Sequence, residues 1–217
     1  RARAVEWAAL EMRYAGNGIG CSNPPASAFA PTAGIKFFWE TNMHQCSQEI
    51  RNKLSEIVSP KNESWWTPEL FEKNVRNILP HEIEIVEPPP IEQKQYNCFI
   101  SALGLENDKK FVGNHSSEDS AFYQLSFFPK LIKSGLLTIT ITPAPGDLIL
   151  YKNEKGVMTH AGKMESSDIV ISKWSWGPLV RHNIWCVPKH YGNKIIYCNK
   201  PDDISLTKII EFEEKLL

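Results

Sequence analysis

The sequence lacks the features of a nucleic-acid-binding or membrane protein. Lys and Arg total 24 against 25 Asp and Glu, so the formal net charge is −1 and no basic surplus is available for phosphate groups. No apolar run approaches the roughly 20 residues that cross a bilayer. The sequence does not show the pattern of a signal peptide, which is a positively charged start followed by an apolar core. We therefore expect no nucleic-acid or membrane partner, and the location stays open between the cytoplasm and secretion by a route that the sequence does not show.

Cysteine is also scarce and widely spaced. The five cysteines are Cys21, Cys46, Cys98, Cys186 and Cys198. The sequence contains neither a CxxC nor an HxxxH pair, so we expect no metal site and no cofactor. The odd number gives no complete disulfide framework, although a Cys186–Cys198 bridge stays open for an oxidising compartment.

Composition and proline positions suggest three parts. Residues 1–34 hold nine alanines and no lysine, unlike the rest of the chain, and are expected to be a leader or linker that is either disordered or not native to the protein. Residues 35–90 are expected to form a helical appendage, because 45–58 has helical apolar spacing and Thr67-Pro68 is a typical helix start. The prolines at 88–90 mark the expected boundary to a main domain at 91–217.

The main domain reads as helices followed by strands. We expect a helix from Cys98 to Leu105, a second helix over 118–134 and a final helix capped by Ser205. Apolar runs predict strands over 136–142, 147–152, 159–164, 168–174, 183–188 and 194–198. Helices followed by a run of strands predict an α+β fold with an antiparallel sheet.

One cysteine is placed as a nucleophile would be. In QYNCFISALG (95–104), Cys98 lies at an expected helix start, where the helix dipole and free N–H groups favour a thiolate and bind an oxyanion. His160 follows a turn and begins a strand of small residues, so it is the best candidate for the base. The alternative is structural: Cys98 fills a core and His160 caps a turn.

The order of three motifs resembles a known superfamily. YNCFISALG, PGDLILY and THAGKM follow one another as in NlpC/P60-like members of the papain-like cysteine hydrolases, and the later SKW, His, VP and YG resemble a subgroup of them. The similarity covers about 95–192. It implies a papain-like fold in which the helix bearing Cys98 packs on an antiparallel sheet or half-barrel. It also implies Cys98 as nucleophile, His160 as base, and a peptide or amide substrate.

The sequence departs from that pattern at two points. Asn97 replaces the usual Asp before the cysteine, and no third catalytic residue is evident. We expect His182 to orient the imidazole, with Ser172 as second choice. Strand alternation places Ser172 and Lys173 on opposite faces, and Lys173 is expected in solvent or a salt bridge. Candidates for substrate or oxyanion contacts are Tyr96, Asn97, Ser172 and Trp176.

Three functions therefore stay open. The first is a thiol hydrolase that works through a Cys98 acyl-enzyme. The second is a catalytically silent binding module on the same fold, with the N-terminal helices docking a protein partner. The third is a transferase or deamidase that uses the same Cys98–His160 pair. A thiol and an imidazole within roughly 4 Å at an open cleft favour the enzymes, whereas a buried Cys98 favours the module.

Overall fold

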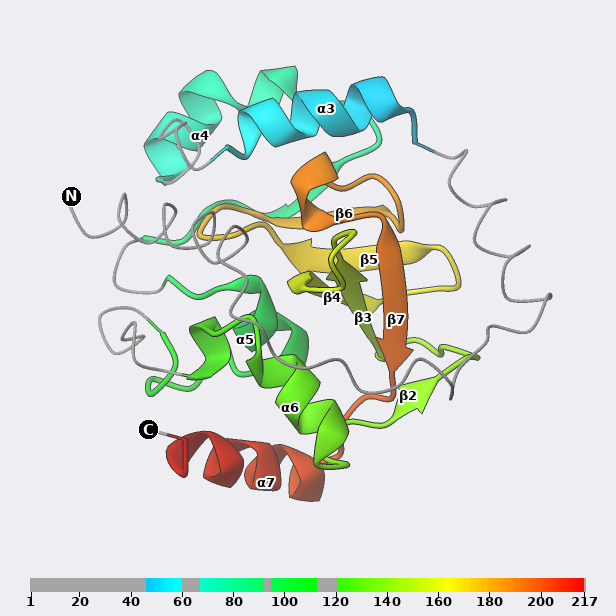
Figure 1. Cartoon of the computed structure of the whole chain (residues 1–217). Helices are drawn as coiled ribbons and strands as arrows, with labels where there is room; N and C mark the ends of the chain where they lie inside the picture. Colours follow the sequence, from blue (N-terminus) through cyan, green and yellow to red (C-terminus); the bar gives the residue numbers. More distant parts are fainter. Residues whose placement is uncertain (1–45, 60–66, 92–94, 113–120, 217) are drawn as a thin grey trace.

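An antiparallel sheet forms the centre of the molecule (Figure 1). The computed structural model describes residues 46–59, 67–91, 95–112 and 121–216, so the expected leader at 1–34 lies outside the described residues. The strands follow the order β1-β6-β5-β4-β3-β7-β2, and every pairing is antiparallel. They are β1 (Glu84–Glu87), β2 (Ile139–Thr140), β3 (Leu148–Lys152), β4 (Met158–Met164), β5 (Ile169–Lys173), β6 (Leu179–Asn183) and β7 (Lys194–Cys198). The predicted α+β class is confirmed.

Helices cover both faces of this sheet (Figure 1). On one side lie α3 (Gln48–Ile57) and α4 (Pro68–Asn74), and on the other α5 (Cys98–Leu103), α6 (Phe127–Lys133) and α7 (Asp203–Glu214). Short 3₁₀ turns are η3 (Arg76–Ile78), η6 (Ala121–Tyr123) and η7 (Lys189–Tyr191). Within the described part of the chain, no helix combines the length and apolar character needed to cross a membrane.

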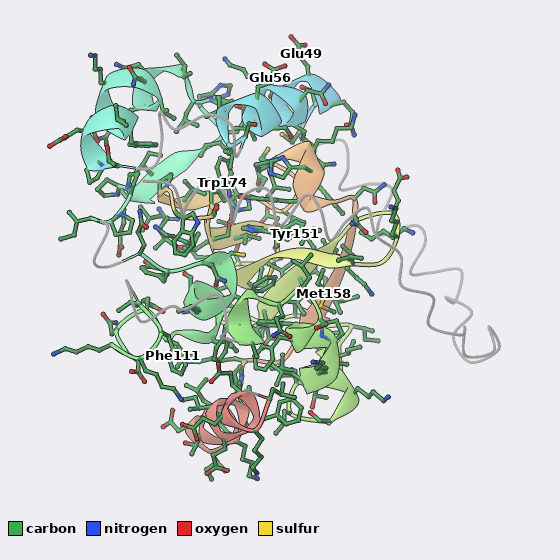
Figure 2. The ribbon with its side chains drawn as sticks, turned by 60° about the vertical axis from the view of Figure 1, so that its left-hand side comes forward. Glu49, Glu56, Phe111, Tyr151, Met158 and Trp174 are labelled. Carbon is green, nitrogen blue, oxygen red and sulfur yellow. The ribbon has the colours of Figure 1, made fainter. Side chains whose placement is uncertain are left out.

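Each face of the sheet has its own hydrophobic core. Side chains alternate along a strand, so Ile149 and Tyr151 of β3 enter the core beneath α3, while Leu148 and Leu150 enter the core beside α5. We call these the α3-side core and the α5-side core. Trp174 belongs to the first and Phe111 to the second, and Figure 2 shows them on opposite sides of the sheet.

Most helix starts agree with the sequence signals. The Thr67 hydroxyl accepts the N–H of Leu70, and Pro68 occupies the first turn of α4, as predicted. The predicted cap of α7 is wrong by three residues, because Asp202 holds that position and its carboxylate accepts the Ser205 N–H at 2.7 Å. Ser205 thus lies in the first turn of the helix.

The segment expected as an appendage is built into the sheet domain. Its strand β1 pairs with β6 and forms one edge of the sheet. Arg51 of α3 is 2% exposed, and its guanidinium donates to the carbonyls of Val187 (3.2 Å) and Gly192 (2.5 Å). These contacts tie 46–87 to the part of the chain beyond the proline segment.

Three predicted elements differ from the observed ones. The strand expected at 183–188 is wrong: β6 ends at Asn183, and the Cys186 N–H closes a turn onto the Asn183 carbonyl. Of the run 136–142, only Ile139–Thr140 is strand. The helix expected over 118–134 begins at Phe127 in the described part of that range. A short apolar run shows only that a segment is buried, and a buried turn has the same pattern as a short buried strand.

Candidate functional site

Cys98 begins α5, and the residue before it is a helix cap. The Asn97 side-chain oxygen accepts the N–H groups of Phe99 and Ile100, each at 3.0 Å, and its amide donates to the Phe122 carbonyl at 3.2 Å. Cys98 is 7% exposed and belongs to the α5-side core. Two of the first-turn N–H groups that would stabilise a thiolate or an oxyanion are therefore already bonded to Asn97.

His160 lies in β4 directly opposite Tyr151 of β3, so both side chains point into the α3-side core. Its ring stacks on Tyr191 with centroids 4.0 Å apart and planes 10° from parallel. The side chain is fully buried, and neither ring nitrogen has a hydrogen-bond partner in the described part of the chain. Burial, assisted by His182, lowers the pKa of His160 well below its usual value, so the imidazole is neutral.

The sheet separates the expected nucleophile from the expected base. Ala161, the next residue along β4, packs in the α5-side core together with Cys98. Neighbouring side chains of a strand point to opposite faces, so His160 points away from Cys98. The partnerless ring nitrogens of His160 also exclude a hydrogen bond to the Cys98 sulfur. The structure does not bring the expected pair together.

The two candidate orienting residues bond to each other. The backbone carbonyl of Asn183 can only accept, so His182 Nδ1 donates to it at 2.8 Å and Nε2 is the acceptor. The Ser172 hydroxyl donates to that Nε2 at 2.8 Å and accepts the Trp174 indole N–H at 3.1 Å. Burial lowers the pKa of His182 to about 4. This closed chain of donors and acceptors leaves neither residue oriented toward His160.

Lys173 is buried, so the expectation that it lies in solvent is wrong. Among the described residues, its ammonium forms no salt bridge either. The side chain is 1% exposed on the α5 side of β5. Its ammonium donates to the Gly177 carbonyl and lies 4.8 Å from the centre of the Tyr96 ring. Burial lowers the pKa of Lys173 to about 7, against an opposing effect of Glu87. Strand alternation placed Lys173 opposite Ser172, but nothing in the sequence indicated that α5 would cover that face.

The remaining candidates, Tyr96 and Trp176, pack against the α5-side core. Tyr96 is buried, which raises its pKa to about 12. Trp176 is half-buried against the α5-side core. A cavity of about 10 Å³, room for one water, lies where α3 and α4 meet Trp174 and Pro178, and no predicted catalytic residue lines it. In the described residues, no three His, Cys, Asp or Glu side chains are grouped to hold a metal.

The fold and these contacts define an α+β domain whose sheet lies between two helical layers and separates a buried thiol from a buried imidazole. The model of a family described as a domain of unknown function, DUF7689, matches residues 90–199, just over half of the chain. The chain belongs to this family. No curated protein and no solved structure matches it. The matched region runs from the proline segment to β7 and includes both Cys98 and His160.

Proposed function

We propose that this chain is an interaction module that binds an extended peptide segment at the β2 edge of its sheet. The observation that carries the proposal is the contrast between the two sheet edges, one charged and the other uncharged and apolar. The separation of Cys98 from His160 supports it further, because it argues against catalysis by that pair.

The β2 edge of the sheet has the properties that allow another strand to pair with it. The run LLTITIT at 136–142 carries no charge, and Ile139 and Ile141 are 52% and 81% exposed. The Thr138 carbonyl accepts the Asn199 N–H from the end of β7. Along an antiparallel strand, the backbone groups of successive residues point to opposite sides, so the N–H and C=O of Ile139 point away from β7. An exposed, uncharged edge of this kind favours addition of a further strand.

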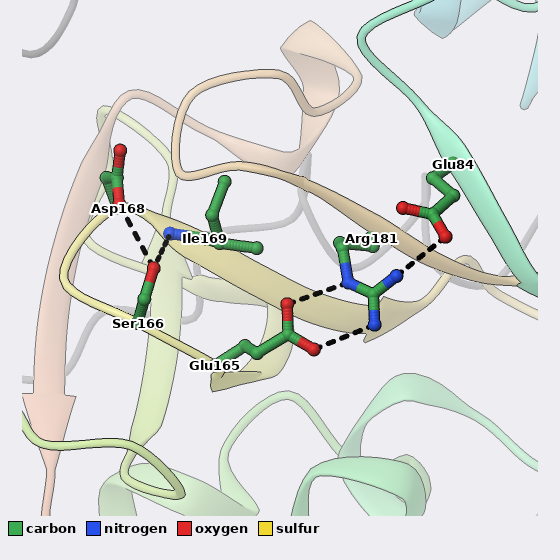
Figure 3. Close-up of polar contacts among 6 residues, drawn as sticks. All are labelled: Glu84, Glu165, Ser166, Asp168, Ile169 and Arg181. Atoms are coloured by element: carbon green, nitrogen blue, oxygen red, sulfur yellow. Dashed lines mark hydrogen bonds and ion pairs between the residues drawn. The ribbon is translucent and has the colours of Figure 1, made fainter.

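The β1 edge is protected by charge. Arg181 of β6 bonds Glu165 through two nitrogens, at 2.7 and 2.8 Å, and also reaches Glu84 of β1 at 2.7 Å (Figure 3). Glu84 and Glu87 are exposed, and the register between β1 and β6 shifts at Ile85/Glu87. Edge charges and bulges discourage pairing with another chain. The partner we propose is therefore an uncharged segment with apolar residues at alternate positions, bound at β2.

Selection from a displayed peptide library tests this surface. We expect enrichment of extended peptides with alternating apolar residues, and at least tenfold weaker binding by Ile141→Lys. Val86→Lys is the matched control, since Val86 is 37% exposed at the opposite edge, and it should bind as the unmodified chain does. The proposal fails if no peptide is enriched, or if the two variants bind the selected peptides equally well.

A thiol hydrolase with a papain-like fold is the second candidate, favoured by the position of Cys98 at the first residue of α5. Labelling with iodoacetamide near neutral pH separates the two proposals. The interaction module predicts that Cys98 reacts no faster than a free thiol, as a buried side chain should. Faster labelling that is abolished by Cys98→Ala and slowed by His160→Gln would support the hydrolase, or the transferase and deamidase that share its chemistry.

A further inference from the structure

Two cysteines far apart in the sequence meet in the α3-side core. Cys46 directly precedes Ser47, the N-cap of α3, and Cys186 lies in the turn after β6. Cys46 is 3% exposed and Cys186 is fully buried. Both side chains belong to the α3-side core, close enough for each thiol to shift the pKa of the other. Contact between two thiols is the first requirement for a disulfide between them.

Neighbouring contacts fix the positions of the two segments that carry these cysteines. Arg51, one turn into α3, donates to the carbonyls of Val187 and Gly192, so the helix and the segment after Cys186 are fastened together. The interaction with Cys186 lowers the pKa of Cys46, and the same interaction raises the pKa of Cys186. The Arg51 charge favours the Cys46 thiolate and Glu82 opposes it. Cys46 is therefore the attacking sulfur of the two.

We propose that Cys46 and Cys186 form a reversible disulfide that fixes α3 to the sheet domain, with a small-molecule disulfide such as oxidised glutathione as the oxidant. The Cys46 thiolate attacks one sulfur of the oxidant and releases one glutathione thiolate. Cys186 gives up its proton and attacks the Cys46 sulfur of the mixed disulfide, which releases the second glutathione. The protein loses two hydrogen atoms, and one oxidised glutathione becomes two reduced molecules.

Closing this bond has a large expected effect on the unfolded chain. The disulfide would enclose roughly 140 residues, and long closed loops restrict the unfolded ensemble most. We expect the oxidised protein to melt about 5–10 °C above the reduced protein. Since both sulfurs are buried, exchange requires local opening at the start of α3 and should be slower than with a free thiol.

The test uses the full chain carrying Cys21→Ser, which removes the cysteine outside the described residues. After incubation with oxidised glutathione, peptide mapping should find a Cys46–Cys186 crosslink, and the higher melting temperature should be reversed by dithiothreitol. Cys198→Ser is the matched control and should keep both results. The proposal is overturned if mapping finds glutathione adducts or other pairings in place of this crosslink, or if the crosslinked protein melts no higher than the reduced one.

Discussion

The buried His182 should make folding stability depend on pH below neutrality. The pKa of His182 is about 4 in the folded protein, compared with 6.5 for an unperturbed histidine. Between these values the unfolded chain binds the proton more readily than the folded one, so stability falls as the pH drops through this window. One such group lowers the free energy of unfolding by ~2 kcal/mol between about pH 7.5 and about pH 5. His160, whose pKa is also lowered, acts in the same direction.

Urea unfolding at a series of pH values measures this effect. Carboxylates also titrate in acid, so the informative quantity is the difference between the unmodified chain and His182→Gln. Glutamine offers a donor for the Asn183 carbonyl and an acceptor for the Ser172 hydroxyl, but it does not titrate. We expect the variant to lose ~2 kcal/mol less than the unmodified chain over that pH range. Parallel stability curves for the two proteins would refute the assignment of a buried, neutral His182.

Chemical denaturation of further variants tests three other contacts. Arg51→Met removes the donors to two buried carbonyls and should destabilise the fold by about 3 kcal/mol, whereas a loss under 1 kcal/mol would contradict the anchoring role. Gly192→Ala should lower the free energy of unfolding by more than about 3 kcal/mol, because the added Cβ would lie 2.2 Å from the Lys152 carbonyl oxygen. Gly135→Ala is the control: nothing lies within 4 Å of its added Cβ, so it should lose about 1 kcal/mol. Equal losses in the two variants would refute the steric argument. Asn97→Ala should lose about 1–2 kcal/mol by uncapping α5, and Asn97→Asp should retain most of that stability.

The sequence predicted the α+β class and several helices and strands because the relevant signals are local. Thr67-Pro68 specified the start of α4, and the alternation of Val170, Ser172 and Trp174 against Lys173 specified the two faces of β5. The strand expected at 183–188 was wrong because the apolar residues there are buried in a turn. Periodicity does not distinguish a buried turn from a short buried strand.

The candidate site was less predictable because it depends on which face of the sheet receives α5. The helix start at Cys98 and the strand bearing His160 are both present. Their relation depends on the side of the sheet to which the chain crosses after β1, which no local pattern encodes. The contact between Cys46 and Cys186 depends in the same way on long-range packing, so spacing alone offered only a Cys186–Cys198 bridge.

The family match leaves out the two helices on the α3 side of the sheet and one helix on the other side. A fragment limited to 90–199 would lack α3, α4, β1 and α7. Its β6 would become an open edge, the α3-side core would face water, and the carbonyls of Val187 and Gly192 would lose their guanidinium donor. Such a fragment should aggregate when expressed, so recombinant work on this chain should begin at or before Cys46 and continue through Glu214.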